Sequence, residues 1–253
     1  MRPLILLFLF LLSSTVPAAG VDKAPYIDRV FSQGERIEYT LTWLGVSGGE
    51  AVITVTPGEG RFTIHTLART LGAIGRLYPV RDEIETVVSS SNFSTLRFEK
   101  RLNERGREKH VQTIFDPKRK VATRRGVEMP YEPPIFDPLS SIYYLRTLDL
   151  TPGKKHMMTI IADSEIYEIE AEVLAREEID IQGSRFRTVV VEPKMRKGGI
   201  FRDENNRLLI WYTDDARRIP VRIRSELAFG SITATIRNSR LLGDGAVPSG
   251  KSK

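Results

Sequence analysis

The sequence predicts an all-β, mainly antiparallel protein, built as one large curved sheet or an open β-barrel with one short helix. Apolar and polar residues alternate with a period of two along many segments, and turn-forming residues separate these segments. Open twisted sheets rarely exceed about ten strands. A sheet with more strands than that must curl, close or fold onto itself, so a curved sheet follows from the number of candidate strands.

The first strand is the clearest, because four apolar residues alternate with polar ones and share a face: Ile37, Tyr39, Leu41 and Trp43. Further strands in the first half are expected at Glu50 to Thr56, Arg61 to Ala68, Asp82 to Ser89, Thr95 to Leu102, Glu108 to Phe115 and Lys120 to Arg124. Those in the second half are expected at Met157 to Ala162, Ile166 to Ala175, Arg185 to Glu192, Leu208 to Thr213, Val221 to Ala228 and Ser231 to Asn238. Trp43 and Trp211 each end an alternating apolar run, so we expect both to be largely buried.

One segment, Asp137 to Arg146, has helical rather than strand character. Asp is a good N-cap and Pro suits the first helical position, which is where Pro138 stands. Leu139, Ile142 and Tyr143 follow at i, i+3 and i+4, so one side of the helix is apolar. This side should cover or plug the sheet.

The N-terminus has the three parts of a secretory signal peptide: Arg2, an apolar run from Leu4 to Leu12, and the small-residue exit Val16-Pro17-Ala18. The apolar run is too short to span a bilayer, which takes about 20 residues. We expect cleavage after residues 1–18, a mature chain from Ala19 or Gly20, and a periplasmic location with no transmembrane span after cleavage. Residues 19–29 read as a linker, 30–242 as a single domain and 243–253 as a disordered tail.

Composition limits the chemistry and the partners. The chain has no cysteine, which excludes disulfides, thiolate metal sites and a lipid attached to cysteine. Its formal net charge of +6 favours anionic partners. Outside the cytoplasm these are lipid head groups and envelope glycolipids rather than nucleic acid.

No strong catalytic signature is present, and the sequence predicts no metal and no cofactor. The three histidines, His65, His110 and His156, lack the paired spacing of a metal site. Ser140 and Ser141 lie in the first turn of the helix without a nucleophile elbow. Asp214 and Asp215 are adjacent on an extended chain and point opposite ways, so a tight turn is favoured over paired acids.

Two segments are candidate binding surfaces. The segment from Leu71 to Pro79 is apolar but broken by glycines, and is interpreted as a mobile flap whose Leu71, Ile74, Leu77 and Tyr78 contact a ligand. The alternative is a buried loop that completes the core.

The second candidate is the densest cluster of basic residues, between Arg101 and Arg125. Its residues Arg119, Lys120, Arg124 and Arg125 could dock to an anionic membrane or glycolipid surface. The alternative is a solvated face interrupted by glutamates.

Several short motifs resemble the bacterial exported family called domain of unknown function 3108. They comprise Gly34-Glu35, Tyr39, Trp43, the helix with Asp137, Ser140 and Arg146, and Trp211, Asp215, Arg218 and Pro220. The resemblance implies a periplasmic, mostly β protein without an established activity, and it supplies no catalytic residues. The expected shape is also similar to that of the curved-sheet periplasmic lipoprotein carriers, although a shared fold does not fix function.

Together these observations favour a non-enzymatic factor of the cell envelope that binds a lipid or another apolar ligand in a curved sheet. A structural scaffold that binds envelope proteins is the alternative. An enzyme acting on envelope polymers is the third hypothesis.

Overall fold

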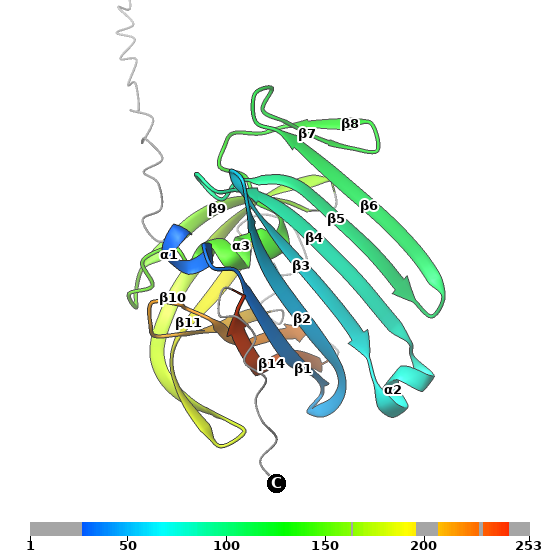
Figure 1. The fold of residues 1–253 in the computed structure, drawn as a ribbon, viewed down its shortest axis with the longest axis vertical. Helices are drawn as coiled ribbons and strands as arrows, with labels where there is room; N and C mark the ends of the chain where they lie inside the picture. The colour runs from blue at the N-terminus through cyan, green and yellow to red at the C-terminus, as the bar shows by residue number, and fades with distance from the viewer. Residues whose placement is uncertain (1–26, 163, 196–206, 228–229, 243–253) are drawn as a thin grey trace, which may run out of the picture.

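A single antiparallel sheet dominates the structure, a computed structural model that describes residues 27–162, 164–195, 207–227 and 230–242 (Figure 1). Its first eight strands are β1 (Glu35–Trp43), β2 (Val46–Gly58), β3 (Arg61–Thr70), β4 (Val80–Ser89), β5 (Thr95–Glu104), β6 (Arg107–Asp116), β7 (Val121–Arg124) and β8 (Val127–Pro130). The others are β9 (Lys155–Ala162), β10 (Glu165–Ile181), β11 (Ser184–Met195), β12 (Arg207–Thr213), β13 (Pro220–Leu227) and β14 (Gly230–Leu241). The predicted fold class is confirmed. The predicted signal peptide and tail lie outside the described residues.

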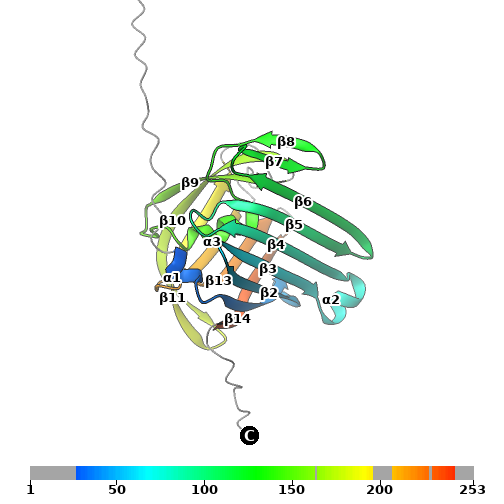
Figure 2. The ribbon, with the colours of Figure 1, turned by 45° about the horizontal axis from the view of Figure 1, so that its top comes forward.

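The first and the last strand of the chain lie side by side in the middle of the sheet. The order is β8-β7-β6-β5-β4-β3-β2-β1-β14-β13-β12-β11-β10-β9, so β1 lies between β2 and β14 (Figure 2). Glu35 pairs with Leu241 at one end of β1, and Trp43 pairs with Ile232 at the other. Strands from the two halves of the chain therefore form one continuous surface.

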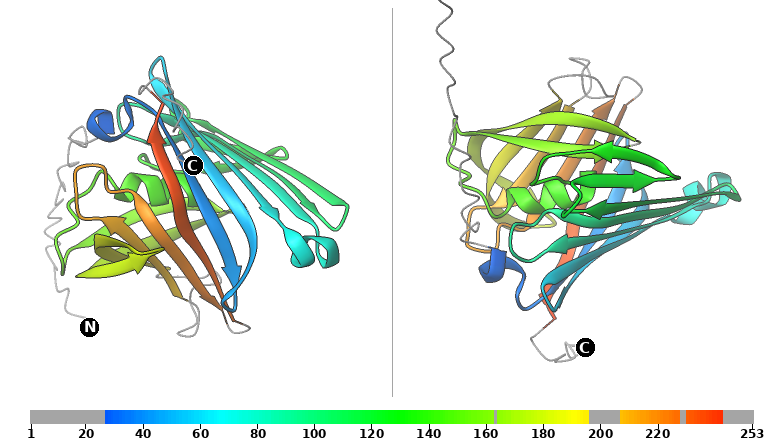
Figure 3. Two further views of the ribbon diagram at one scale, coloured as in Figure 1. Left: turned by 60° about the horizontal axis from the view of Figure 1, so that its bottom comes forward. Right: turned by 90° about the horizontal axis from the view of Figure 1, so that it is seen from above.

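The sheet curls around α3 (Pro138–Leu145) without closing (Figure 3). The edge strands β8 and β9 do not pair with each other. Part of the gap is bridged by residues 135 and 136: the Thr95 N–H donates to the Ile135 carbonyl, and the Phe136 N–H donates to the Thr159 carbonyl. The result is an open barrel with the predicted helix on its concave face.

Asp137 caps α3 as the sequence predicts. Its carboxylate accepts hydrogen bonds from the backbone N–H groups of Leu139 and Ser140, and the Ser140 hydroxyl accepts one from the Asp137 N–H, which completes a capping box. Tyr143 and Leu145 are fully buried. The apolar side of α3 thus fills the concave face near the bridge.

The structure adds three elements that the sequence did not predict. β8 is a four-residue strand, too short for a visible alternation. α1 (Ile27–Phe31) begins inside the predicted linker and buries Ile27 and Phe31 in the core. α2 (Gly72–Leu77) occupies the predicted flap. No helix among the described residues is long and apolar enough to cross a membrane.

Several hairpins turn through two residues with positive φ, the second of them glycine. In the β1–β2 turn, φ is 50° at Leu44 and 81° at Gly45. Positive φ at both central residues matches the right-handed twist of the flanking strands, and glycine adopts it at little steric cost. Gly45 therefore marks a tight hairpin turn between β1 and β2.

Candidate functional site

A buried ion pair lies between α3 and the first strand. The Arg146 guanidinium is fully buried and faces the Glu35 carboxylate, with a distance of 2.9 Å between Arg146 Nη2 and Glu35 Oε2. It also donates to the Arg217 carbonyl at 2.9 Å and lies over the rings of Phe31 and Tyr143. Burial opposes the charge, but Glu35 outweighs burial and raises the pKa of Arg146. The pair ties the end of α3 to the start of β1.

Neighbouring motif residues also make structural contacts. Gly34 has a φ of 66°, and a Cβ there would lie 2.8 Å from the Val55 carbonyl oxygen, so glycine is required. The Tyr39 hydroxyl donates to the Pro220 carbonyl at 2.8 Å, which ties β1 to the start of β13. Arg218 donates to the carbonyls of Arg146 and Leu148, just beyond α3. Arg146 and Arg218 therefore fix the end of α3.

The helix cap Asp137 and three residues that were weighed for catalysis, Ser140, Asp214 and Asp215, all make structural contacts. Asp137 accepts from the Thr95 hydroxyl at 2.9 Å, and Ser140 takes part in the cap. Burial raises the pKa of Asp137 against the hydrogen bonds that lower it. Asp215 accepts from the N–H groups of Arg217 and Arg218, which is the predicted tight turn, and Asp214 instead pairs with Arg176. The motif residues thus position α3.

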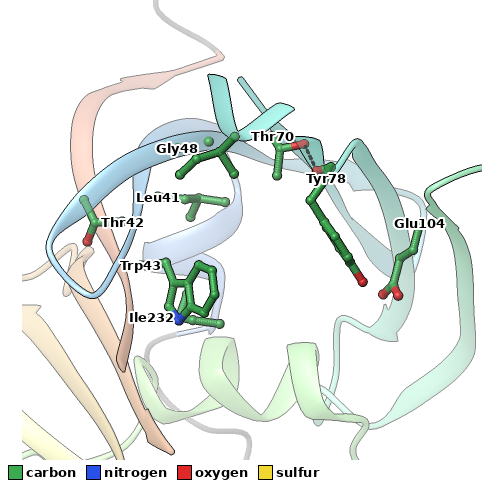
Figure 4. A pocket seen from close by; sticks show the side chains of 10 residues that line it. Leu41, Thr42, Trp43, Gly48, Thr70, Tyr78, Glu104 and Ile232 are labelled. Carbon is green, nitrogen blue, oxygen red and sulfur yellow. Dashed lines mark hydrogen bonds between the residues drawn. The ribbon is translucent and has the colours of Figure 1, made fainter. Parts of the chain in front are cut away.

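The open end of the barrel contains an apolar pocket of about 600 Å³ (Figure 4). Leu41 and Trp43 of β1 and Ile232 of β14 form one wall. Tyr78 and Glu104 of β5 lie on the other side, and Ile74 of α2 lines the pocket next to Gly48 of β2. α3 does not reach this end, so the concave face remains open here.

The flap that the sequence predicts is a short exposed helix fixed at both ends. The Leu71 N–H donates to the Gly48 carbonyl at 2.8 Å, and the Thr70 hydroxyl donates to the Tyr78 carbonyl at 2.9 Å. A Cβ at Gly48 would overlap the Ile74 side chain, so this glycine lets α2 approach β2 closely. None of the α2 residues is buried, which contradicts the alternative of a buried loop.

The four predicted flap residues divide into two groups. Ile74 and Tyr78 line the pocket. Leu71 is exposed outside it, and Leu77 is 80% exposed. Leu41, Ile232 and Glu104 were missed by sequence reasoning, because they come from separate strands and no spacing links them.

The prediction that Trp43 is buried is wrong, because its side chain is 50% exposed. Trp43 continues the alternation of Ile37 and Tyr39, both of which are buried. The alternation assigns a residue to a face of the sheet but does not show whether that face is covered. Trp43 projects from the concave face beyond the core and therefore lines the pocket. Trp211 is 8% exposed, as predicted.

The four basic residues of the second candidate surface lie at different turns. Arg119 and Lys120 lie between β6 and β7 and are paired with Glu128 and Glu132. At the other end of β7, Arg124 is the last residue of the strand and Arg125 lies in the turn before β8. The strand separates the two pairs, and carboxylates offset the charge of the first pair.

The histidines lie apart on β3, β6 and β9. His110 contacts Glu99, with 2.8 Å between Nε2 and Oε1, and His156 contacts the Asp149 carbonyl. His65 pairs across the sheet with Glu85. In the parts of the chain that the structure describes, no group of three or more histidine, aspartate or glutamate residues could hold a metal ion.

Glu99 gives a testable pH dependence. Burial opposes its ionisation, but hydrogen bonds from His110 and Gln112 and the charge of Arg101 lower its pKa below the ordinary 4.5. A carboxylate whose pKa is lower in the folded than in the unfolded protein stabilises the fold at pH values above its unfolded pKa. This stabilisation is lost as the pH falls through its folded pKa. We therefore expect the free energy of unfolding of the wild type to exceed that of Glu99→Gln near pH 7, and the difference to shrink below about pH 4.5.

Urea unfolding at a series of pH values measures this difference. Glu108→Gln is the matched control, because Glu108 is exposed on the neighbouring strand β6. The control should follow the wild type at every pH. A constant difference between Glu99→Gln and the wild type from pH 7 to pH 3 would contradict the assignment.

Comparisons with known proteins agree with the fold. A profile of the family described as "Protein of unknown function (DUF3108)" matches residues 38–237. A solved structure from Brucella abortus, described as a β-barrel-like protein of domain of unknown function DUF1849, has a TM-score of 0.60 and 12% sequence identity. The similarity covers 82% of this chain and 97% of that one. No curated protein matches the sequence. Both matches are described only as domains of unknown function, so neither indicates an enzyme family.

Proposed function

The chain belongs to the DUF3108 family, and we propose that it is a non-enzymatic periplasmic protein that binds a lipid or another long apolar ligand. The observation that carries this proposal is the apolar pocket at the open end of the curved sheet. Its volume of about 600 Å³ lies within the range of roughly 300–1,000 Å³ that is usual for small-molecule sites.

The walls of the pocket suit an acyl chain. Leu41, Ile74 and Ile232 provide aliphatic contacts, and Trp43 adds a large ring surface. Burial of about ten methylenes would contribute on the order of 8 kcal/mol before the costs of ordering and association. Micromolar affinity corresponds to about 8 kcal/mol net, so further contacts, such as those with the Trp43 ring, must offset these costs.

Glu104 sets the orientation of the ligand. It is the one charged side chain among the described residues that line the pocket, and it is exposed. A charged carboxylate in this position stays hydrated and disfavours apolar atoms beside it. The polar end of the ligand therefore lies near Glu104, with the chain directed towards Leu41 and Ile232.

The periplasmic location rests on the N-terminal sequence. Arg2, the apolar run from Leu4 to Leu12 and the exit Val16-Pro17-Ala18 support export and cleavage. The chain has no cysteine, so its fold does not depend on disulfides. The lack of cysteine is therefore compatible with the oxidising periplasm and with the reducing cytoplasm alike.

Replacing Ile74 by aspartate tests the pocket. We expect saturable, micromolar binding of a fluorescent fatty acid to the wild type, and at least about a tenfold weaker affinity for Ile74→Asp. The reason is that Ile74 lines the pocket, and a carboxylate there would have to lose its water to contact an apolar ligand. Displacement by unlabelled envelope lipids would show that the probe and the lipids share a site.

The control is Ile114→Asp, which makes the same change at an exposed residue of β6 outside the pocket. Circular dichroism should show that both variants are folded. An affinity of Ile74→Asp equal to that of Ile114→Asp would refute the pocket. The absence of saturable binding to the wild type would favour the scaffold function.

A further inference from the structure

We propose that the open end of the barrel docks on an anionic lipid bilayer through an apolar rim around the pocket, an inference that rests on the proposed function. The rim consists of Trp43, Leu44, Val46, Leu71, Leu77 and Tyr78. These are six of the twelve large apolar side chains that the described residues expose. The β1–β2 turn and the α2 segment supply them, and both turns border the pocket (Figures 1 and 4).

Folding explains Leu44 only in part, because its side chain lies against Gly230 of β14 but is still largely open to solvent. It occupies the first central position of the β1–β2 turn with a φ of 50°, where asparagine, aspartate or glycine is preferred. It is also 61% exposed. A left-handed backbone conformation is strained for leucine, and exposure of its apolar side chain to water is unfavourable. Both the turn conformation and the solvent would therefore favour another residue here. If an apolar surface covered the turn, the Leu44 side chain would be removed from water and leucine would be favoured over a polar residue.

The charge near the rim fits an anionic bilayer. Three arginines, Arg76 of α2 and Arg105 and Arg107 at the β5–β6 turn, outnumber the two carboxylates at that turn, Glu104 and Glu108. The Arg105 guanidinium lies 5.5 Å from the centre of the Tyr78 ring. In the described part of the chain, neither Arg76 nor Arg107 forms a hydrogen bond or an ion pair with a carboxylate. Their charges are available to lipid phosphates.

The chemistry of the rim favours a bilayer over a folded protein partner. Tryptophan and tyrosine are enriched where membrane and water meet, and arginine there reaches lipid phosphates while its stem lies against apolar groups. The rim also encircles a pocket that fits an acyl chain. Docking would place the pocket opening against the bilayer, so that a chain could move between the two without crossing water.

The experiment is co-flotation of the protein with vesicles. We expect the wild type to partition onto vesicles of phosphatidylglycerol and phosphatidylethanolamine more strongly than onto phosphatidylcholine vesicles, and less strongly as salt is raised. Leu44→Asn combined with Leu77→Asn should lower the partition coefficient at least about tenfold. Neither residue lines the pocket, so the double variant should still bind the fluorescent fatty acid. It should be at least as stable as the wild type, because asparagine suits the turn.

Two controls make the test specific to the rim. Val127→Asn changes an exposed apolar residue at the start of β8 and should leave partition unchanged. Changing Arg119, Lys120, Arg124 and Arg125 to glutamine tests the other basic surface and should also have little effect. Partition lost in this four-residue variant but kept in the leucine variant would overturn the proposal.

Other results would also refute docking by the rim. Equal partition of the wild type and the leucine variant would do so. A wild type that sediments as a dimer, with the leucine variant a monomer, would show that a second copy covers the rim. In each case the fatty-acid assay reports separately on the pocket, so failure of docking and failure of ligand binding are distinguishable.

Discussion

Replacing Arg146 by methionine should lower the free energy of unfolding by about 3–5 kcal/mol. The variant keeps an apolar side chain of similar length but leaves the Glu35 carboxylate, which is 1% exposed, without its cation. An uncompensated buried charge is much less favourable than a buried pair. The Arg217 carbonyl loses a donor as well. Urea unfolding followed by circular dichroism measures the change, and the melting temperature should fall by on the order of 10 °C.

Two further variants separate charge burial from simple loss of contact. Arg237→Met removes one of the two arginines that pair with Glu38 on the opposite face of β1, and should change stability by about 1 kcal/mol or less. Glu35→Leu combined with Arg146→Met removes both charges and should be more stable than Arg146→Met alone. If Arg146→Met is as stable as Arg237→Met, the pair does not anchor α3.

The two tryptophans should respond differently to replacement by alanine. Trp211→Ala should lower the free energy of unfolding by about 3–5 kcal/mol, because its buried ring leaves a cavity. Its Nε1 also donates to the Glu177 carboxylate, and Arg222 lies over the ring at 5.7 Å. Trp43→Ala should change stability by about 1 kcal/mol or less, because the ring is half exposed.

Circular dichroism is the suitable probe of unfolding, since each variant removes one of the two tryptophans. Binding of the fluorescent fatty acid should rank the two variants in the opposite order. Trp43→Ala should weaken binding, and Trp211→Ala should leave the affinity of the folded protein unchanged. A loss of stability for Trp43→Ala as large as that for Trp211→Ala would mean that the open end is packed rather than hollow.

The strands and α3 follow from the sequence because their signals are local. Alternation along β1 and the cap at Asp137 depend on neighbouring residues, and both are confirmed. The site depends on positions that only the sheet order brings together. Leu41 and Ile232 are far apart in sequence yet lie on adjacent strands, so nothing near either residue reveals the other.

The motif residues illustrate a second limit of the sequence. Glu35 and Arg146 were identified separately, and no local pattern shows that a buried carboxylate on β1 meets a guanidinium after α3. Trp43 shows the converse. Its place in the apolar–polar alternation is the same as that of a core residue. Only the position of α3 determines that the space around Trp43 is unfilled.

The pairing of β1 with β14 has a consequence for the time course of folding. The partner of Glu35 is Leu241, so the central seam of the sheet forms only when nearly the whole described chain is present. Contacts of such long sequence separation slow folding, because the chain between them must be ordered first. In the proposed export from the N-terminus, β1 would leave the membrane long before β14 emerges. Until β14 emerges, one edge of β1 would stay unpaired, and strands of other chains could pair with it. A chaperone would have to cover this edge until translocation ends.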